Sequence, residues 1–236
     1  MYAESPDQLA QSDYVCSACA TIYRRQTEFC VRCFRSGIIV PRFIRPADEI
    51  LPSQPGKTAN ELAAANTRSF QLKAYPELRL GPGSLLCIHG GPGQGKTTWS
   101  LKAAEAMRPA LVCPLEEGFS PVLTERLQRL ELRHADMHFE IPSSVTELVA
   151  RCDKLNPRCL VIDSVQMSSL LPEDLLKLAR SRKFVLIALS QHTKAGECAG
   201  SHQLQHLADV VVRVEAMKWH LEKSRYQAAT LVGDVL

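Results

Sequence analysis

Short apolar runs alternate with helical patterns along the chain from about Leu72 onward. Compact apolar runs are typical of buried β-strands, and apolar residues spaced three and four positions apart are typical of helices. The predicted strands are Ser84–His89, Ala110–Leu115, Met137–Ile141, Cys159–Ile162, Phe184–Leu189 and Val210–Val214. The predicted helices are Lys96–Met107, Pro121–Leu132, Ser144–Leu155 and Glu173–Ser181. Strands that alternate with helices indicate an α/β fold, with a mostly parallel sheet covered by helices on both faces.

The pattern also predicts how one helix begins and how the sheet ends. Ser144 and Glu147 fit a capping box, in which two side chains bond to backbone amides at the start of a helix. The last apolar runs, between Val210 and Leu231, follow one another without a helix. We therefore expect antiparallel strands at one edge of the sheet.

The composition is that of an ordinary globular protein. The chain has 236 residues, of which 45% are hydrophobic and 22% are charged. This length suits one full domain with a small appendage, and the composition excludes a mostly disordered, collagen-like or supercharged chain. The longest apolar runs, such as Phe184–Leu189, are far shorter than the roughly 20 residues that cross a bilayer, so we expect no membrane partner. The N-terminal residues show neither a basic leader nor an apolar stretch, so we expect a cytoplasmic protein.

Positive charge is concentrated near the N-terminus. The segment from Ala20 to Pro46 contains six arginines and a single acid, Glu28, although the net charge of the whole chain is only +3. Such a cluster is typical of a contact with a nucleic-acid phosphate backbone. A solvated face or an acidic protein partner would give the same pattern, and the charge alone leaves these alternatives open.

Four of the nine cysteines form two closely spaced pairs. These are Cys16, Cys19, Cys30 and Cys33, which give two Cys-x2-Cys knuckles separated by ten residues. Paired knuckles of this kind complete a tetrahedral zinc shell, and four thiolates leave no open position for catalysis. We therefore predict a structural Zn²⁺ site that supplies the folding energy of a segment too small for its own core; a redox dithiol pair is the less favoured alternative. The five other cysteines receive no chemical role.

A phosphate-binding motif follows the first predicted strand of the main domain. Gly90-Gly91-Pro92-Gly93-Gln94-Gly95-Lys96-Thr97 matches the P-loop pattern, and a predicted helix begins within it. The glycines allow backbone amides to surround phosphates, Lys96 reaches the β- and γ-phosphates, and the Thr97 hydroxyl binds Mg²⁺. We assign to nucleotide binding Gly90, Gly91, Pro92, Gly93, Gln94, Gly95, Lys96, Thr97, Thr98 and Asp163.

Three later strands end in polar residues that suit the same site. Asp163 ends the apolar run Leu160–Ile162, as an acid that coordinates the magnesium of a P-loop protein does. Glu116 and Glu117 follow another strand, where a carboxylate can activate the attacking water or simply be a surface acid. Gln191 ends a further strand, where its amide can detect a γ-phosphate.

In order and spacing, these segments resemble bacterial RadA, also called Sms, a family of RecA-like ATPases of DNA recombination and repair. The resemblance runs from about Tyr14 to the end, through the knuckles, the P-loop and the segments ALVCPLEEG, LVIDSVQ, SQHTKAG, LADVVVRVE and EKSRYQA. It implies a RecA-like core behind a four-cysteine zinc ribbon. It also implies hydrolysis of ATP with Mg²⁺, stimulation by DNA, and action on single-stranded or branched DNA. We expect a flexible tail over 1–13, the zinc ribbon over 14–46, a linker with one short helix over 47–71 and the ATPase domain over 72–236.

The resemblance also implies roles for individual residues. Glu116 corresponds to the catalytic carboxylate, with Glu117 beside it. Lys223-Ser224-Arg225-Tyr226 resembles the Lys-Asn-Arg-Phe-Gly signature of the family. Lys223 and Arg225 would then reach ATP bound to a neighbouring subunit, which requires a ring or filament. If the chain processes DNA, the loop Lys194–His206 would contact the strand, but we favour a plain polar loop or helix surface for His202 and His206.

Several departures from the family pattern point to a compact form. The signature has Ser, Tyr and Gln in place of Asn, Phe and Gly, and the segment between Asp163 and Phe184 is shorter. We also expect the C-terminal protease-like domain of the family to be missing. These departures favour an alternative function, a regulatory ATP-binding switch that presents its zinc ribbon to a protein partner. A kinase is less favoured because no Arg-rich lid follows Asp163, and a GTPase because no Asn-Lys-x-Asp motif is present.

Overall fold

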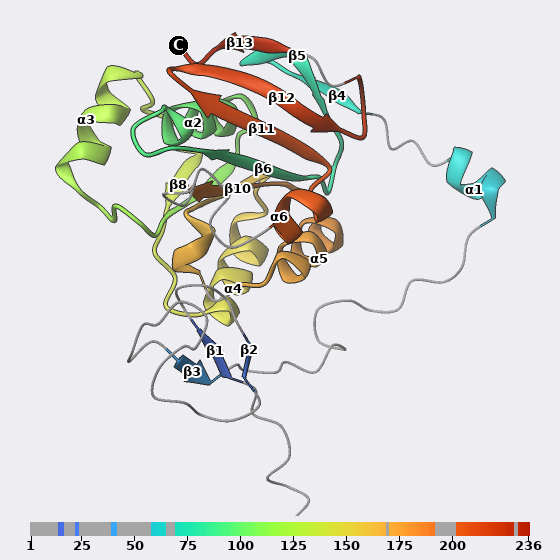
Figure 1. Cartoon of the computed structure of the whole chain (residues 1–236), viewed down its shortest axis with the longest axis horizontal. Helices are drawn as coiled ribbons and strands as arrows, with labels where there is room; N and C mark the ends of the chain where they lie inside the picture. The colour runs from blue at the N-terminus through green and yellow to red at the C-terminus, as the bar shows by residue number, and fades with distance from the viewer. Residues whose placement is uncertain are drawn as a thin grey trace, which may run out of the picture. The chain divides into compact units, whose positions relative to one another are not determined.

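The computed structural model describes residues 14–16, 22–23, 39–41, 58–64, 69–168, 170–191, 202–228 and 231–236. The chain divides into two compact units, Met1–Pro52 and Ser53–Leu236, which are described separately below (Figure 1).

The N-terminal unit contains a small antiparallel sheet with the strand order β2-β1-β3. Its strands are β1 (Tyr14–Cys16), β2 (Ile22–Tyr23) and β3 (Ile39–Pro41). Cys16 ends β1 opposite Ile39. The other predicted zinc ligands, Cys19, Cys30 and Cys33, lie outside the described residues, as do the six clustered arginines. No group of potential metal ligands occurs among the residues that are described, so the zinc site stays a prediction.

The C-terminal unit is built on an eight-stranded mixed sheet with the order β13-β12-β11-β6-β10-β9-β7-β8 (Figure 1). Its strands are β6 (Leu85–Gly90), β7 (Ala110–Pro114), β8 (Met137–Phe139), β9 (Cys159–Asp163), β10 (Val185–Gln191), β11 (Val210–Glu215), β12 (Lys218–Ser224) and β13 (Val232–Asp234). The six strands from β8 to β11 in this order are all parallel. All six predicted strands are therefore confirmed, and β12 and β13 form the predicted antiparallel edge.

Helices cover both faces of this sheet, as the sequence pattern predicted. The main helices are α2 (Lys96–Ala106), α3 (Pro121–Arg129), α4 (Val145–Leu155), α5 (Pro172–Arg182) and α6 (His202–Leu207). Leu86 and Ile88 of β6 pack on the face covered by α2 and α3, whereas Leu85 and Cys87 pack on the face covered by α4, α5 and α6 (Figure 1). This alternation gives the sheet two apolar layers, which is the arrangement of an α/β fold.

The helix starts and lengths refine the sequence predictions. Ser144 accepts a hydrogen bond from the Glu147 amide at 3.1 Å, but the Glu147 carboxylate accepts from the Ser143 amide rather than from Ser144. The first hydrogen bond of the predicted capping box is therefore present, and the second is made to Ser143, one residue before the expected Ser144. The loop predicted over 194–206 is wrong in its last part, because α6 begins at His202. Within the described ranges the longest helices have 11 residues, and none could span a membrane.

Two elements precede the main sheet. The short helix expected in the linker is α1 (Ala59–Ala64). A hairpin of β4 (Phe70–Leu72) and β5 (Tyr75–Leu80) follows it, and the sequence pattern did not predict this hairpin. Tyr75 of β5 stacks on Trp99 of α2, with ring centroids 4.4 Å apart, and meets the edge of Trp219 at 5.8 Å. The hairpin therefore closes the apolar layer beneath the P-loop helix.

Candidate nucleotide-binding site

The predicted nucleotide-site residues gather at one edge of the sheet. Gly90, Asp163 and Gln191 are the last residues of β6, β9 and β10, and Glu116 follows the end of β7 by two residues. Because these four strands are parallel, their carboxyl ends meet at the same edge, where open α/β sheets bind ligands. The fold therefore brings together residues from four separate segments.

The P-loop turns sharply between β6 and α2. Gly90 has a φ of 153°, and a Cβ at this position would lie 2.1 Å from the Val214 carbonyl oxygen. Gly95 is the N-cap of α2 in a left-handed conformation. Only glycine fits the close approach at Gly90, and the first turn of α2 presents unpaired amides toward the loop. This is the backbone geometry that binds phosphate.

Lys96 is held inside the loop. Its side chain is buried, and its Nζ donates hydrogen bonds to the carbonyl oxygens of Gly90 at 2.9 Å and Gly91 at 2.8 Å. Burial lowers the pKa of Lys96, and the negative charges of Asp163 and Glu116 oppose this shift. The ammonium therefore lies within the phosphate loop, with acidic side chains near it.

The two predicted magnesium ligands contact each other. The Thr97 hydroxyl donates a 2.7 Å hydrogen bond to the Asp163 carboxylate, which is only 6% exposed as a residue. The pKa of Asp163 is raised to about 6, chiefly by burial and also by the charges of Glu116 and Glu117, while the Thr97 hydrogen bond and Lys96 oppose the rise. A hydroxyl and a carboxylate that converge at this distance fit Mg²⁺, because hard cations bind oxygen ligands. A divalent cation would also offset the negative charge that accumulates here.

Glu116 and Glu117 have different surroundings. Gln191 donates a hydrogen bond from its amide to the Glu116 carboxylate, and the Glu116 backbone amide donates to the Asp163 carbonyl oxygen at 2.9 Å. Glu117 instead forms an ion pair with Arg126 of α3. Only Glu116 is therefore bonded to another predicted site residue, while Glu117 is anchored to the neighbouring helix.

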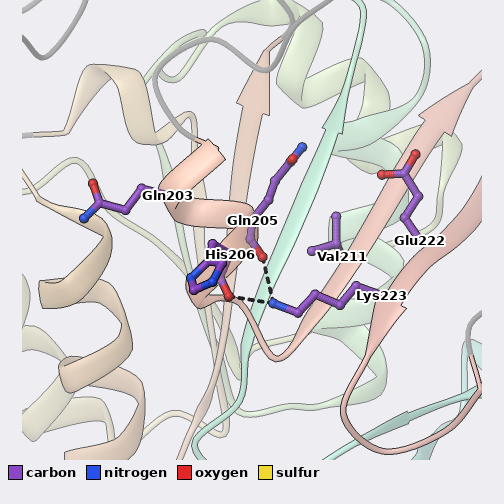
Figure 2. Close-up of a pocket in the computed structure, with 6 residues that line it drawn as sticks. All are labelled: Gln203, Gln205, His206, Val211, Glu222 and Lys223. Carbon is purple, nitrogen blue, oxygen red and sulfur yellow. Dashed lines mark hydrogen bonds between the residues drawn. The ribbon is translucent and has the colours of Figure 1, made fainter.

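Lys223 and Arg225 lie far from the P-loop of their own chain. Ser224, which stands between them, pairs with Val210, and Val210 pairs with Leu86 near the amino end of β6. Lys223 Nζ donates to the carbonyl oxygens of Gln205 at 3.0 Å and His206 at 2.6 Å, as Figure 2 shows. Burial and the charge of Arg225 lower the pKa of Lys223. The fold thus separates both residues from the edge that carries Lys96.

Both basic residues have partners within the chain. Arg225 donates to the Asp209 carboxylate at 3.0 Å. Lys223 also lines an open pocket of about 670 Å³ between α6 and the β11–β12 pair (Figure 2). The other residues around this pocket are Gln203, Gln205, His206, Val211 and Glu222.

One contact at the P-loop was not predicted from the sequence. The turn between β11 and β12, Ala216–Met217, bonds to Gln94: the Ala216 amide donates to the Gln94 side-chain oxygen. The Met217 amide donates to the Gln94 carbonyl oxygen at 3.3 Å. The turn follows β11, which is parallel to β6 and therefore ends at the same edge of the sheet as the P-loop. The prediction of β11 as a strand was the one signal in the sequence that could have indicated this contact.

Comparisons with known proteins agree with this geometry. The chain is 25% identical over 259 residues to the DNA repair protein RadA of Mycobacterium tuberculosis, which covers 96% of this chain and 52% of that protein. It is 26% identical over 235 residues to the DNA repair protein RadA of Haemophilus influenzae, covering 86% and 51%. The resemblance to RadA is confirmed, and the chain spans about half the length of the curated relatives it matches. No family model matches the chain.

The fold is also similar to a solved structure. A KaiC-like protein from the archaeon Pyrococcus horikoshii superposes with a TM-score of 0.54, at 16% identity, over 70% of this chain and 93% of that one. This similarity is one of fold, and it agrees with the predicted α/β core of a mostly parallel sheet with helices on both faces.

Proposed function

We propose that this chain is a RecA-like ATPase that acts on DNA in recombination or repair, as the name of its RadA relatives suggests. One observation carries the proposal: Lys96, the Thr97–Asp163 pair and the Glu116–Gln191 pair all lie at one edge of the sheet. Nucleotide hydrolysis needs a phosphate-binding loop, a metal site and a group that orients water, and the residues at this edge are proposed to provide all three.

Each of these side chains has a distinct role in the proposed reaction. Lys96 exchanges its two carbonyl partners for the β- and γ-phosphates, which it approaches from within the loop. Thr97 and Asp163 would hold Mg²⁺, which would supply positive charge beside the phosphates. Glu116 orients and deprotonates the attacking water. Gln191, bonded to Glu116, donates to the γ-phosphate and loses this partner after hydrolysis.

The N-terminal unit is proposed to bind Zn²⁺ through Cys16, Cys19, Cys30 and Cys33. Four thiolates at this spacing form a closed structural site. The six arginines of this unit are proposed to contact the phosphate backbone of single-stranded or branched DNA.

Self-association into a ring or filament is proposed from the positions of Lys223 and Arg225. Both residues lie toward the edge of the sheet opposite their own P-loop. Residues in this position can reach only a nucleotide on another subunit, as basic fingers in trans do.

Titration of ATP turnover against single-stranded DNA tests this function. We expect turnover to rise with DNA and to fall to background in Lys96→Ala, because the phosphate contact is lost. Arg129→Ala is a matched control, since it removes an exposed basic side chain from α3. ATP binding without affinity for any DNA at low salt would overturn the DNA part and select the regulatory switch. Failure to bind ATP would overturn the whole proposal.

A further inference from the structure

Nucleotide bound at this site would have a fixed direction. The groups proposed to act at the γ-phosphate are Asp163 at the end of β9, Gln191 at the end of β10 and Glu116 just after β7. These three strands all lie on one side of β6 in the sheet. The P-loop follows β6 itself, and β11 and β12 lie on its other side. The nucleoside is at the opposite end of the triphosphate from the γ-phosphate. It therefore emerges on the side of the β11–β12 turn.

The β11–β12 turn is fixed to the P-loop on this side. Ala216 and Met217 both have positive φ angles, 49° and 61°, as a tight two-residue hairpin requires. Their amides bond to the side chain and the backbone of Gln94, as described above. The Met217 carbonyl oxygen accepts a 2.9 Å hydrogen bond from the buried Val235. The turn is thus bonded on both sides and holds its position relative to the phosphates.

The Met217 side chain lies along the last glycine of the loop. A Cβ on Gly95 would be 2.7 Å from the Met217 sulfur, so the thioether approaches the loop backbone directly. Met217 is nevertheless 36% exposed, unlike the buried side chains of the core. A thioether does not bind phosphate, so the exposed Met217 side chain is not a ligand of the triphosphate. Its polarizable sulfur is suited to the face of an aromatic ring.

We infer that Met217 forms the platform on which the base of the bound nucleoside triphosphate rests. This inference depends on the proposed function, because it assigns the nucleoside end of the same ATP site. Gln94 connects the platform to the phosphate loop, so base and phosphates are positioned by one bonded unit.

The contribution of Met217 to binding can be distinguished from that of the phosphate loop by comparing two ligands that carry the same number of phosphates. Calorimetry with Mg²⁺ would measure the affinity of the full chain for ATP and for inorganic tripolyphosphate, which lacks a nucleoside. We expect Met217→Ala to weaken ATP binding about five- to tenfold and to leave tripolyphosphate binding unchanged. Met217→Leu, which keeps an apolar surface, retains most of the ATP affinity. Met167→Ala is the matched control, because Met167 is also exposed but follows β9.

Each other outcome overturns a defined part of this scheme. Unchanged ATP affinity in Met217→Ala would overturn the platform and leave the ATPase proposal intact. An equal loss for both ligands would also overturn it, because the turn would then act only by supporting the loop. A wild-type chain that binds neither ligand would overturn the proposed function, and the platform with it.

Discussion

Gln191 donates a hydrogen bond to Glu116 across the end of β9, although the two residues are 75 positions apart in the sequence. The bond joins the ends of β10 and β7, which are not neighbours in the sheet. It therefore couples the residue proposed to orient water with the residue proposed to detect the γ-phosphate. The two would respond together to hydrolysis.

The first prediction concerns the two adjacent glutamates. Glu116→Gln removes the carboxylate that would accept a proton from water, so we expect ATP turnover to fall by about 100-fold or more with ATP binding retained. Glu117→Gln breaks the ion pair with Arg126 and is expected to reduce turnover far less. Single-turnover hydrolysis and calorimetric binding of ATP measure both effects. Equal losses of turnover in the two variants would contradict the assignment of Glu116.

The second prediction tests action in trans. Arg225→Ala and Glu116→Gln are each expected to be inactive in ATP turnover when assayed separately. When the two variants are mixed in equal amounts, about a quarter of the subunit interfaces should regain activity. At these interfaces an Arg225→Ala subunit provides an intact Glu116, and its Glu116→Gln neighbour provides an intact Arg225. Arg180→Ala is the control, because Arg180 also pairs with the Asp209 carboxylate, at 3.7 Å. If mixing restores no turnover, Arg225 does not act on a neighbouring site.

The third prediction compares two glycines of the P-loop. Gly90→Ala places a methyl group 2.1 Å from a backbone oxygen, which no side-chain movement can relieve, so we expect a loss of about 3 kcal/mol or more in unfolding free energy. A Cβ at Gly93 meets nothing within 4 Å, but its φ of 72° is left-handed, so Gly93→Ala should lose only about 1 kcal/mol. Urea unfolding measures both changes. Similar losses would show that backbone strain, rather than contact, dominates at Gly90.

The fourth prediction concerns pH in the absence of magnesium. Burial raises the pKa of Asp163 from 3.8 in the unfolded chain to about 6 in the folded one, so the folded chain retains this proton longer. Between pH 3.8 and about pH 6 the folded state binds more protons than the unfolded state. The stabilisation that comes from the protonated Asp163 is therefore lost as the pH rises through this range. Asp163→Asn removes this loss and should be more stable than the wild type at pH 8 by about 2–3 kcal/mol.

Urea unfolding in a chelator between pH 4 and pH 8 checks this dependence on Asp163. The difference between Asp163→Asn and the wild type should shrink to a small fraction of its pH 8 value at pH 4, where Asp163 is protonated in the folded state and about half protonated in the unfolded state. A difference that is the same at every pH would contradict the assigned pKa. Thr124→Ala, on the exposed surface of α3, serves as a control without a charge change.

The fifth prediction concerns thiol reactivity and zinc. Burial raises the pKa of Cys113 and of Cys152 to about 12, so both should resist iodoacetamide in the native protein. The four proposed zinc ligands should react only after a chelator has removed one zinc ion per chain. Peptide mass mapping and a colorimetric zinc assay measure both results. Immediate labelling of the Cys-x2-Cys pairs without chelator would contradict the zinc site.

The parts of the fold that could be predicted from sequence were those with a strong local pattern. The central strands β7, β9 and β10 contain continuous apolar runs, because both of their faces are covered. The P-loop was identified from eight consecutive residues. By contrast, the β4–β5 hairpin was missed because β5 contains Pro76 and exposed charged residues such as Glu77 and Arg79 among its buried positions.

The contacts that sequence could not supply depend on strand order. The Ala216–Met217 turn meets Gln94 only because β11 lies beside β6, and nothing local to either segment encodes this neighbourhood. The Lys223 bonds to the carbonyls of α6 depend on the same arrangement. Convergence of Asp163, Glu116 and Gln191 was predictable in outline, because parallel strands share one carboxyl edge.

The stack of Tyr75 on Trp99 has a spectroscopic consequence. Trp99 and Trp219 are the only tryptophans of the chain, and both are buried in the apolar layer beneath the P-loop helix. Among the residues that the structure describes, none forms a hydrogen bond with the Trp99 indole nitrogen, and the side chains of the apolar layer surround it. Tryptophan fluorescence, excited selectively over tyrosine, therefore arises wholly from the C-terminal unit, and its red shift on denaturation reports the unfolding of that unit alone.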